Sequence, residues 1–364
     1  MSRAHSVDPN RTAPCINAIG AAVPGHDIHH AFIGWARARL SDREARLFDR
    51  MVERAGIGHR WSVLPAGSDG GSPVAAGGFY ADTMPGTAAR MAIYADAAPT
   101  LAIEAIDRLA ERTDLNGITH LVVASCTGFV APGIDQRIAA RIGLSPGVER
   151  LLVGFMGCYA AVAALRSARH IVRSDPAARV LVVTVELSTL HLQPDDALEP
   201  LLAMLQFGDG AAAALVSAEP AGFAIEAPFA ATLPASADLI RWDITDAGFA
   251  MHLSGEVPGR IATALADPGF AAAATGGRSI AAIDGWAVHA GGRSILDAVE
   301  RSLSLSPDAL AASRGVLAAN GNMSSATLMF VLADMLAGPP VADGIALAFG
   351  PGLAAEGFGF RSAA

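Results

Sequence analysis

The sequence predicts an α/β protein of two similar halves, layered as helix, sheet, helix, sheet and helix. Short apolar runs alternate with longer stretches of helical periodicity, which is typical of sheets covered by helices. Residues 154–160 and 321–327 read as copies, because each opens a helix that is followed by an apolar strand. Cys158 falls opposite Ser325 in this comparison. Since strand–helix–strand repeats give parallel pairs, we expect mainly parallel sheets.

A second pair of stretches supports the duplication. Residues 119–128 and 285–292 each read as a strand followed by a glycine-containing turn. Equivalent strand ends of two packed halves converge near a pseudo-twofold axis, so the turns at Cys158, His289 and Asn322 are expected to meet there. The predicted organisation is a flexible start, a first half with the cysteine, and a second half with the histidine and asparagine: residues 1–13, 14–220 and 221–364.

Elements of the first half follow from short apolar runs and from helical spacing. Strands are predicted where apolar and β-branched residues run together: 15–23, 121–125, 150–155, 179–185 and 211–216. Helices are predicted where apolar residues recur three or four positions apart: 31–56, 87–97, 98–112, 133–143 and 159–173. The strand at 150–155 is mostly apolar, and we expect it to be buried.

Elements of the second half are separated by glycine and proline. The predicted strands are 223–229, 249–253, 285–288 and 344–349. The predicted helices are 260–266, 293–303 and 327–336. Val-Pro-Gly at 257–259 and Pro-Gly at 268–269 set the ends of the first of these helices, because both residue types interrupt regular structure.

Length and composition exclude several classes of protein. The 364 residues are 52% hydrophobic and 17% charged, yet no apolar run reaches the ~18–20 residues of a membrane span. The net charge of -9 argues against a nucleic-acid partner. The chain start lacks a signal-peptide core and three cysteines form no disulfide framework, so we expect a cytoplasmic protein without stable membrane insertion. No metal-ligand set is recognisable.

Cys158 is a candidate nucleophile. It lies in Gly-Phe-Met-Gly-Cys-Tyr, where an apolar strand gives way to a helix and glycines permit a tight turn. Free amides and the dipole at a helix N-terminus favour the thiolate, which is the reactive form of cysteine. The alternative is a small buried apolar residue. Cys126, at another strand end, is a second candidate thiol, with cavity lining as its alternative role.

His289 and Asn322 extend this chemistry. His289 ends a strand before Gly291 and Gly292, and it could hold a cysteine thiolate as an ion pair. Asn322 cannot serve as a base, but its amide can donate to a developing oxyanion, with His289 as a second donor. A structural histidine and a helix-capping asparagine are the alternatives. Papain-like hydrolases also use Cys, His and Asn, but the duplicated α/β halves argue against that interpretation.

Two arginines are candidates for phosphate binding. Arg50 and Arg54 lie four residues apart within the predicted helix at 31–56, so they share a face. The alternative is ordinary solvated surface charge.

The motifs, in their order, resemble the type III polyketide synthases, the chalcone synthase-like branch of the thiolase-fold condensing enzymes. The resemblance runs from about residue 16 to residue 360, nearly the whole chain. Its most specific stretches are Gly-Phe-Met-Gly-Cys-Tyr-Ala at 154–160, Phe-Gly-Asp-Gly-Ala-Ala-Ala at 207–213, Val-His-Ala-Gly-Gly at 288–292, Gly-Asn-Met-Ser-Ser-Ala at 321–326 and Phe-Gly-Pro-Gly-Leu at 349–353. It implies a thiolase-like fold.

The resemblance also implies a mechanism. Cys158 takes an acyl starter from CoA and carries the growing chain, and His289 keeps that thiol ionised. His289 and Asn322 bind the malonyl-CoA carbonyl and stabilise the enolate formed as carbon dioxide leaves, and the enolate attacks the thioester in a decarboxylative Claisen condensation. Phe207 matches a gatekeeper between the CoA tunnel and the cavity. The matching CoA-binding positions are Arg50, Arg54, Gly291 and Gly292. The implied enzyme is a homodimer without a metal or prosthetic group.

Several positions depart from the plant members of that family. Met251 stands at a second gatekeeper position where phenylalanine is usual, and Leu47 replaces a lysine of the CoA-binding helix. Ala131 stands where a methionine reaches into the partner subunit's cavity. The remaining departures are in the cavity: Cys126 and Thr127 replace a Thr-Ser pair, and His191 and Trp242 replace smaller residues.

These features predict a bacterial type III polyketide synthase that extends an acyl-CoA with malonyl-CoA and cyclises the product. A narrow apolar route past Met251 and Ala131 favours an alkyl starter, and hence an alkylpyrone or alkylresorcinol. The alternatives are a synthase of malonyl-only polyols, phloroglucinol- or tetrahydroxynaphthalene-like, and a ketoacyl carrier-protein synthase of fatty-acid initiation. A catalytically decayed binding protein is a third, opposed by the intact Cys158, His289 and Asn322.

Overall fold

A large mixed sheet organises the protein. The computed structural model describes residues 13–66 and 72–363, so the predicted flexible start lies outside the described residues except for residue 13. Within these ranges nine strands join in the order β11-β12-β13-β8-β1-β7-β6-β4-β5. The strands of the first half are β1 (Cys15–Ala22), β4 (His120–Ser125), β5 (Glu149–Gly154), β6 (Val180–Leu187) and β7 (Asp209–Ser217). Those of the second half are β8 (Phe223–Thr232), β11 (Gly285–Val288), β12 (Gly344–Gly350) and β13 (Ala354–Ser362).

The strand pairings repeat between the two halves. In the first half β4 pairs parallel with β6, β6 antiparallel with β7, and β7 antiparallel with β1. In the second half β11 pairs parallel with β12, β12 antiparallel with β13, and β13 antiparallel with β8. The halves meet where Cys15 pairs with Ala224 and Ile16 with Phe223. The internal duplication expected from the motifs is therefore present in the topology.

The sheets are not mainly parallel, contrary to the prediction. Helical crossovers connect β4, β5 and β6, and these strands are parallel, as crossover geometry requires. The chain between β12 and β13 is only a short turn at Pro351–Leu353, which returns it antiparallel. The repeated motifs predicted the strands that pair parallel. Strand β13 follows the last motif and was not predicted.

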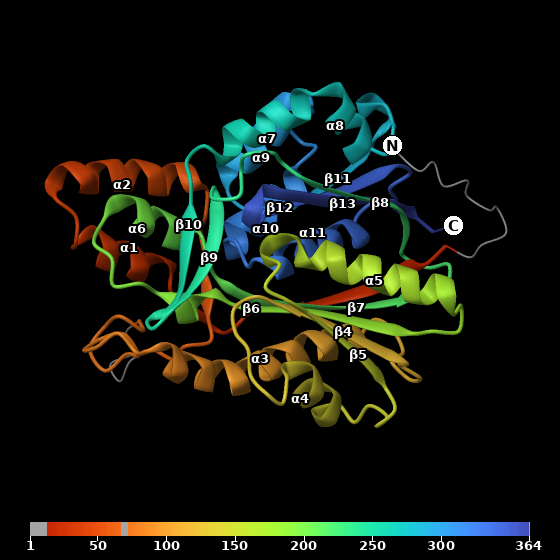
Figure 1. Ribbon diagram of the computed structural model, residues 1–364, viewed down its shortest axis with the longest axis horizontal. Coiled ribbons are helices and arrows are strands. Elements are labelled where there is room, and N and C mark those ends of the chain that lie inside the picture. Colours follow the sequence, from red (N-terminus) through yellow and green to blue (C-terminus); the bar gives the residue numbers. More distant parts are fainter. Residues whose placement is uncertain (1–12, 67–71, 364) are drawn as a thin grey trace.

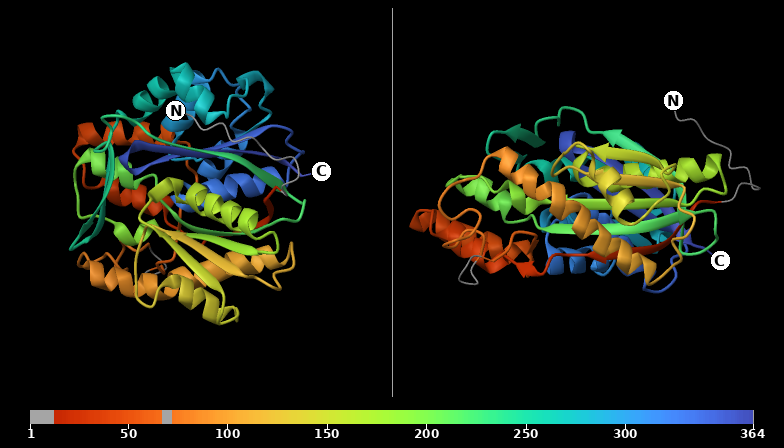
Figure 2. Two further views of the ribbon diagram at one scale, coloured as in Figure 1. Left: turned by 45° about the vertical axis from the view of Figure 1, so that its right-hand side comes forward. Right: turned by 90° about the horizontal axis from the view of Figure 1, so that it is seen from below.

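Helices form three layers around the two half-sheets (Figure 1). The central layer is α5 (Ala160–Ser174) and α11 (Ser325–Leu336), whose buried residues share one core between the halves. The outer layer of the first half is α3 (Thr87–Ala110) and α4 (Ile134–Arg141). The outer layer of the second half contains α7 (Val257–Ala266) and α9 (Arg293–Ser302). Helix α10 (Ala311–Asn320) contributes Val316 to the central core and Leu317 to the outer core of the second half. Figure 2 shows the same order, with α3 and α4 outermost below the first half-sheet.

Side chains alternate between these layers along each buried strand. On β6, Val180 and Val182 enter the central core, whereas Leu181 and Val183 enter the core under α3. On β12, even-numbered residues 346 and 348 face the centre, while 345 and 347 face the outer core of the second half. A strand buried on both faces is therefore a nearly continuous apolar run, which is how these strands were recognisable. The predicted five-layer α/β/α/β/α arrangement is confirmed.

Three helical predictions differ from the structure in detail. The segment predicted at 31–56 is two helices, α1 (His29–Arg37) and α2 (Asp42–Ala55), because Ser41 begins α2 in a capping box with Glu44. The two helices predicted at 87–112 are one, α3, which contains Pro99. Pro99 cannot donate to the carbonyl of Ala95, and the Nη1 of Arg137 donates to that carbonyl instead, at 3.2 Å.

The strand predicted at 150–155 is present, but the prediction that it is buried is wrong. It is β5, which stands at the edge of the sheet and pairs with β4. Leu151 and Leu152 are 43% and 45% exposed in the single chain. With Phe129 and Phe155, which are also exposed, they form an apolar surface that we call the β5 patch. An apolar run thus marked a face that this chain alone does not cover.

Smaller elements complete the fold. They are β2 (His26–Asp27), β3 (Trp61–Ser62), α6 (Leu198–Met204), β9 (Ile240–Thr245), β10 (Gly248–Leu253) and α8 (Pro268–Ala274). The hairpin of β9 and β10 was half predicted, since only β10 has the apolar alternation of a strand. Among the described residues, none of the helices combines the length and apolarity needed to span a membrane.

Candidate active site

Cys158 lies in a tight turn between β5 and α5. Residues 157–159 form a short 3-10 turn that leads directly into the helix. Gly157 has a φ of 70°, and a Cβ there would lie 2.5 Å from the ring of Pro351, so only glycine fits. The turn therefore fixes Cys158 at the start of the central layer, as the sequence predicts.

His289 follows β11, and its ring nitrogens form no hydrogen bond with the described part of the chain. Its backbone N–H donates to the Leu347 carbonyl at 2.8 Å, which extends the ladder with β12. The side chain is 1% exposed, and within residues 13–66 and 72–363 neither Nδ1 nor Nε2 has a hydrogen-bond partner. Buried polar atoms without a protein partner are rare in folded proteins, and water or a bound molecule can supply the missing contact.

Asn322 is held by backbone and side-chain hydrogen bonds. Its N–H donates to the Gln206 carbonyl (2.8 Å), and its carbonyl accepts from the Gly208 N–H (3.0 Å). Its Oδ1 accepts from the Ser324 N–H at 2.8 Å. That contact fixes the amide orientation, so Nδ2 is the group free to donate, and one of its hydrogens reaches the Gly291 carbonyl at 3.1 Å. Asn322 is therefore a fixed donor rather than a helix cap.

One chamber brings Cys158, His289 and Asn322 together. We call it the reaction chamber. Six further predicted site residues line it: Cys126, Thr127, Phe207, Trp242, Met251 and Gly291. The three turns come from both halves of the duplication, as expected for equivalent strand ends meeting near a pseudo-twofold axis.

Burial keeps the cysteine and histidine neutral in this arrangement. Desolvation raises the pKa of Cys158 to about 12, and the charge of Glu186 acts in the same direction. Desolvation lowers the pKa of His289 to about 3. Burial thus favours the neutral form of each group, and the thiolate–imidazolium ion pair implied by the resemblance stays a prediction.

Glu186 is a site residue that the sequence analysis missed. It is fully buried at the end of β6 and accepts from the Ser325 hydroxyl, the Cys126 N–H (2.9 Å) and the Thr127 hydroxyl (3.0 Å). Burial raises its pKa, and these hydrogen bonds oppose that rise. An acidic residue closing the apolar run of β6 was the signal that could have identified it.

Cys126 belongs to this hydrogen-bonded wall. Its Sγ lies 3.3 Å from Glu186 Oε2 and 3.2 Å from the Ser324 hydroxyl. Burial and the Glu186 charge raise the pKa of the Cys126 thiol well above its usual value. Ser324 has a φ of 47°, a strained conformation for a residue with a side chain, at the point where it joins Cys126 to the Asn322 turn. Cys126 is a hydrogen-bonded lining residue here rather than a reactive thiolate.

His191 and Trp242 are fixed in the wall by their ring nitrogens. His191 Nδ1 accepts from the Phe249 N–H (3.0 Å), so its Nε2 donates to the Thr127 carbonyl (2.7 Å). Burial lowers the pKa of His191 to about 3, and its ring stacks on Phe249 with centroids 4.1 Å apart. Trp242 Nε1 donates to the Cys126 carbonyl at 2.8 Å. Both aromatic groups therefore present faces and edges without free hydrogen-bonding atoms.

Arg60 anchors the segment that carries Phe207. This arginine is 1% exposed, and its Nη1 donates to the carbonyls of Met204 (2.9 Å) and Phe207 (3.0 Å). Its Nε donates to Nδ1 of His29 at 3.0 Å. Burial lowers the pKa of Arg60 to about 9, while Asp27 and Asp209 raise it, so the guanidinium stays charged at neutral pH. Sequence reasoning did not identify this residue.

A separate cleft lies next to the Phe207 segment and is lined by Arg54, Gly292, Gln206 and Arg293, among others. Arg54 and Gly292, predicted as CoA-binding positions, thus share one cleft with Arg293, whose Nε lies 3.8 Å from the Asp297 carboxylate of the same lining. Arg50 is exposed on α2 one turn earlier and is not part of that lining. Leu47, at the position of the family's lysine, is 39% exposed on the same helix.

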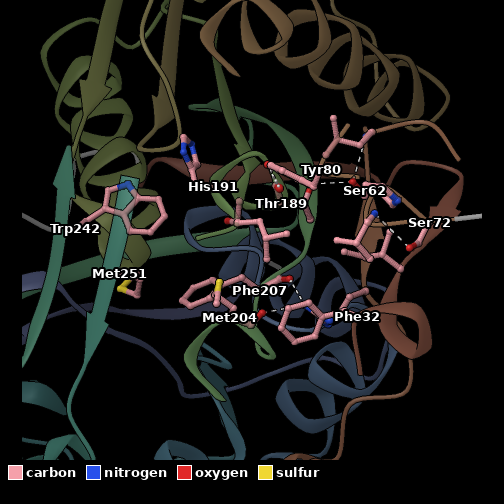
Figure 3. Close-up of a pocket in the computed structure, with 17 residues that line it drawn as sticks. Phe32, Ser62, Ser72, Tyr80, Thr189, His191, Met204, Phe207, Trp242 and Met251 are labelled. Atoms are coloured by element: carbon pink, nitrogen blue, oxygen red, sulfur yellow. Dashed lines mark hydrogen bonds between the residues drawn. The ribbon is translucent and has the colours of Figure 1, made fainter. Parts of the chain in front are cut away.

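A second chamber adjoins the reaction chamber (Figure 3). It lies between α1, the 60–64 and 72–80 segments, and α6. Four residues line both chambers: Ser188, Phe207, Trp242 and Met251. His191 lines the second chamber but not the reaction chamber, so it does not share a chamber with Cys158, His289 and Asn322.

Ala131 lies outside both chambers of its own chain. It is exposed in the loop between β4 and α4, close in sequence to Phe129 of the β5 patch. The predicted alkyl route past Ala131 is therefore not formed by the single chain. Across the described part of the chain, no group of three or more His, Cys, Asp or Glu side chains is placed to bind a metal ion.

Comparisons with known proteins identify the family of this chain. The chain matches the chalcone and stilbene synthase N-terminal domain over residues 3–220 and the C-terminal domain over residues 225–364. It is 38% identical over 251 residues to alpha-pyrone synthesis polyketide synthase-like Pks18 of Mycobacterium tuberculosis, which covers 66% of this chain and 64% of that relative. The match thus spans just under two thirds of that relative's length. It is 35% identical over 340 residues to bisdemethoxycurcumin synthase of Oryza sativa subsp. japonica, covering 87% of this chain and 82% of the relative.

Solved structures show the same fold. The type III polyketide synthase domain of Steely1 from Dictyostelium superimposes with a TM-score of 0.87 at 26% identity, over 97% of this chain and 100% of that one. PKS-I from the brown alga Ectocarpus siliculosus gives 0.89 at 28% identity, over 98% and 100%. The thiolase-like fold predicted from the motifs is thereby confirmed. With both domain models matched along nearly its whole length, the chain belongs to the chalcone and stilbene synthase family, the type III polyketide synthases.

Proposed function

We propose that the protein is a condensing acyltransferase that loads an acyl-CoA starter on Cys158 and extends it repeatedly with malonyl-CoA. The observation that carries this proposal is the buried imidazole of His289, unpartnered among the described residues, in one chamber with Cys158 and the Asn322 amide. A nucleophile, a proton acceptor and a fixed donor are the groups that acyl transfer requires.

Loading begins with a neutral pair. An unoccupied imidazole nitrogen of His289 takes the Cys158 proton as the sulfur attacks the thioester carbonyl, and the departing CoA thiolate recovers that proton. Because burial raises the pKa of Cys158, this scheme forms the thiolate during attack and does not require a preformed ion pair.

Extension uses the same donors on the malonyl thioester. Loss of carbon dioxide leaves an enolate, whose oxygen accepts from Asn322 Nδ2–H and from the His289 ring N–H. The enolate carbon attacks the acyl carbonyl on Cys158, and the sulfur leaves as the new carbon–carbon bond forms. The extended chain, now a thioester of CoA, returns to Cys158 for the next cycle. No metal or prosthetic group takes part in this scheme.

CoA would approach through the cleft that Arg54 of α2 and Arg293 of α9 line. Arg54 and Arg293 place positive charge there for the phosphates, and Gly292 leaves room beside Gln206 for a narrow arm. Arg50 stands one helical turn away on α2, where it adds to the same positive field.

The product proposed is an alkylpyrone or alkylresorcinol. A relative named for alpha-pyrone synthesis supports the first, and the flexible Met251 between the two chambers supports an alkyl starter. Malonyl-only polyols are the rival products, because they would need no space for a starter tail.

A homodimer is proposed as the working form. The β5 patch is apolar, lies at the edge of the sheet and includes Phe129 of the loop that carries Ala131. Edge strands with exposed large side chains associate readily, and a second copy of the chain would cover this one.

The test is incubation with malonyl-CoA and a panel of acyl-CoA starters, followed by mass spectrometry of the products. Wild-type protein and a Cys15→Ala variant, which changes a buried thiol outside the site, should both give repeated two-carbon extensions. A Cys158→Ala variant should give none. A single condensation, or a requirement for an acyl carrier protein, would replace this proposal with fatty-acid initiation.

A further inference from the structure

We propose that the exposed side of α2 is a docking surface for an acidic acyl carrier protein, which presents a starter acyl group on its phosphopantetheine arm. This inference rests on the proposed function and adds a second donor of the starter beside acyl-CoA. The surface, which we call the α2 face, consists of six exposed side chains: Arg43, Arg46, Leu47, Arg50, Met51 and Arg54. Figure 1 shows α2 along an outer edge of the molecule, away from β4 and β5.

The spacing of these residues places them on one side of the helix. Positions 43, 47, 50 and 54 follow the three- and four-residue steps that bring side chains onto a common face. The opposite side of α2 is anchored by Phe48, which is buried in the core of the first half. At a rise of 1.5 Å per residue, the face extends about 16 Å from Arg43 to Arg54. That length is three helical turns, enough for a second helix to pack along it.

The four arginines give the α2 face a strong local positive charge. The nearby carboxylates are engaged elsewhere, since Asp49 pairs with Arg37 of α1 at 3.1 Å and Glu44 accepts hydrogen bonds from Ser41 in the capping box. The whole chain has a net charge of -9, so this cationic surface stands out against an acidic protein. Such a surface attracts a partner of opposite charge and steers its approach.

Two large apolar side chains lie among the arginines. Leu47 is 39% exposed and Met51 is 38% exposed, and they are one helical turn apart. Protein interfaces combine an apolar centre with a polar rim, and methionine and arginine are enriched in them. Leucine in place of the family's lysine at position 47 thus exchanges a phosphate contact for an apolar one. A partner helix with an apolar side chain would cover Leu47 and Met51.

The α2 face leads into the cleft proposed for CoA. Met51 and Arg54 belong both to the face and to the lining of that cleft. Arg293 joins the two helices, because its Nη1 donates to the Arg54 carbonyl at 3.4 Å. Gly292 of the cleft follows directly on Gly291 of the reaction chamber. A carrier protein seated on α2 would therefore hold its arm beside the cleft.

Neither CoA nor a membrane accounts for the whole face. CoA phosphates would be matched by Arg54 and Arg293, whereas Arg46 and Arg43 lie about 12 and 16 Å further along the helix axis from Arg54. An anionic membrane would also meet arginines and apolar side chains, but it has no acyl thioester arm to place in the cleft. The proposal therefore commits to a carrier protein, and the membrane becomes an arm of the test.

The experiment measures dodecanoyl loading on Cys158 without malonyl-CoA, by intact-protein mass spectrometry against time. The two donors are dodecanoyl-CoA and a purified acidic carrier protein of bacterial fatty-acid synthesis with dodecanoyl on its arm. Wild type is compared with the double variant Arg43→Glu/Arg46→Glu and with Leu47→Gln. Arg112→Glu, which reverses an exposed arginine just after α3, is the matched control. Cosedimentation with phosphatidylglycerol–phosphatidylcholine vesicles is measured on the same proteins.

We expect the double variant to lower loading from the carrier about tenfold and to leave loading from dodecanoyl-CoA within about twofold. Wild-type loading from the carrier should fall with added salt, and the double variant should lose most of that dependence. Leu47→Gln should slow loading from the carrier but keep its salt dependence, because it removes an apolar contact and no charge. Arg112→Glu should behave as wild type with both donors.

Three results would overturn the docking surface. They are no loading of wild type from the carrier, equal effects of the double variant on both donors, and equal effects of Arg112→Glu and the double variant. Vesicle binding that depends on Arg43 and Arg46, without loading from the carrier, would reassign the α2 face to an anionic membrane.

These outcomes are separable from those of the proposed function. Loading from the carrier that never leads to extension with malonyl-CoA would refute the synthase proposal and retain the docking surface. Repeated extension from dodecanoyl-CoA in a protein that ignores the carrier would retain the synthase and refute the docking surface. A strict requirement for the carrier would refute the proposed function and retain the docking surface.

Discussion

Replacing Arg60 by methionine should destabilise the protein and slow condensation together. The variant keeps an unbranched side chain of similar length but removes the Nη1 donor that holds the carbonyls of Met204 and Phe207. Each buried carbonyl left unpaired costs about 1–3 kcal/mol, and breaking a buried charge arrangement typically costs about 3–5 kcal/mol. These terms overlap, so we expect the free energy of unfolding to fall by about 3–5 kcal/mol.

The loss of unfolding free energy in Arg60→Met should be larger at higher pH, because Asp209 ionises there. Burial raises the pKa of this carboxyl to about 7, and the charge of Arg60 holds it from rising further. A carboxyl with a raised folded pKa contributes stability below its unfolded pKa, near 4, and loses it as pH rises to the folded value. Without Arg60 the folded pKa of Asp209 rises above 7, so the decline continues to higher pH. The variant should therefore lose more stability at pH 8.5 than at pH 6.

The assay is urea unfolding at both pH values, with single-turnover condensation measured in parallel. Arg37→Met, which removes an exposed arginine paired with Asp49, is the control and should change stability by less than about 1 kcal/mol. Arg60→Lys should recover part of the stability, since it restores charge but not the paired carbonyl contacts. An Arg60→Met protein within 1 kcal/mol of wild type at both pH values, with normal condensation, would refute the role given to Arg60.

Three further predictions concern the thiol, its neighbour and the exposed edge. Alkylation of Cys158 by iodoacetamide should accelerate steadily with pH through pH 9, because burial raises the Cys158 pKa to about 12; a pH-independent rate from pH 5 to 8 would instead reveal a preformed ion pair. Glu186→Gln should speed that alkylation at any given pH, because the Glu186 charge raises the Cys158 pKa; a slower or unchanged rate would exclude this electrostatic effect. Leu152→Glu should shift the protein toward monomer in sedimentation velocity, whereas Arg43→Glu on exposed α2 should not; a dimer unaffected by Leu152→Glu would place the interface elsewhere.

The sequence was informative where chemistry and local backbone coincide. Cys158 and Asn322 each sit in a glycine-containing turn before a helix, and His289 ends a short strand, so local signals placed all three correctly at element ends. The duplication then predicted that these ends meet. Strand type was predicted less well, since antiparallel return of β13 depends on a turn whose neighbours lie far away in the chain.

Local sequence patterns could not predict the buried arginine or the cavities. Arg60 sits in a loop between His59 and Trp61 with no pattern to mark it, and its burial arises only when α6 and the Phe207 segment pack over it. The second chamber is likewise assembled from segments more than 200 residues apart. The apolar run of β5 was read as buried because composition cannot distinguish a core strand from an exposed edge strand.

The most direct test of the central claim is to follow the mass of Cys158 itself during turnover. Protein mixed with a starter acyl-CoA and malonyl-CoA is quenched at successive times, digested and analysed peptide by peptide. We predict an acyl group on the Cys158 peptide first, then the same peptide lengthened by successive two-carbon keto units, with both species absent in Cys158→Ala. An acyl group on the Cys126 peptide instead, or extension that persists in Cys158→Ala, would contradict it.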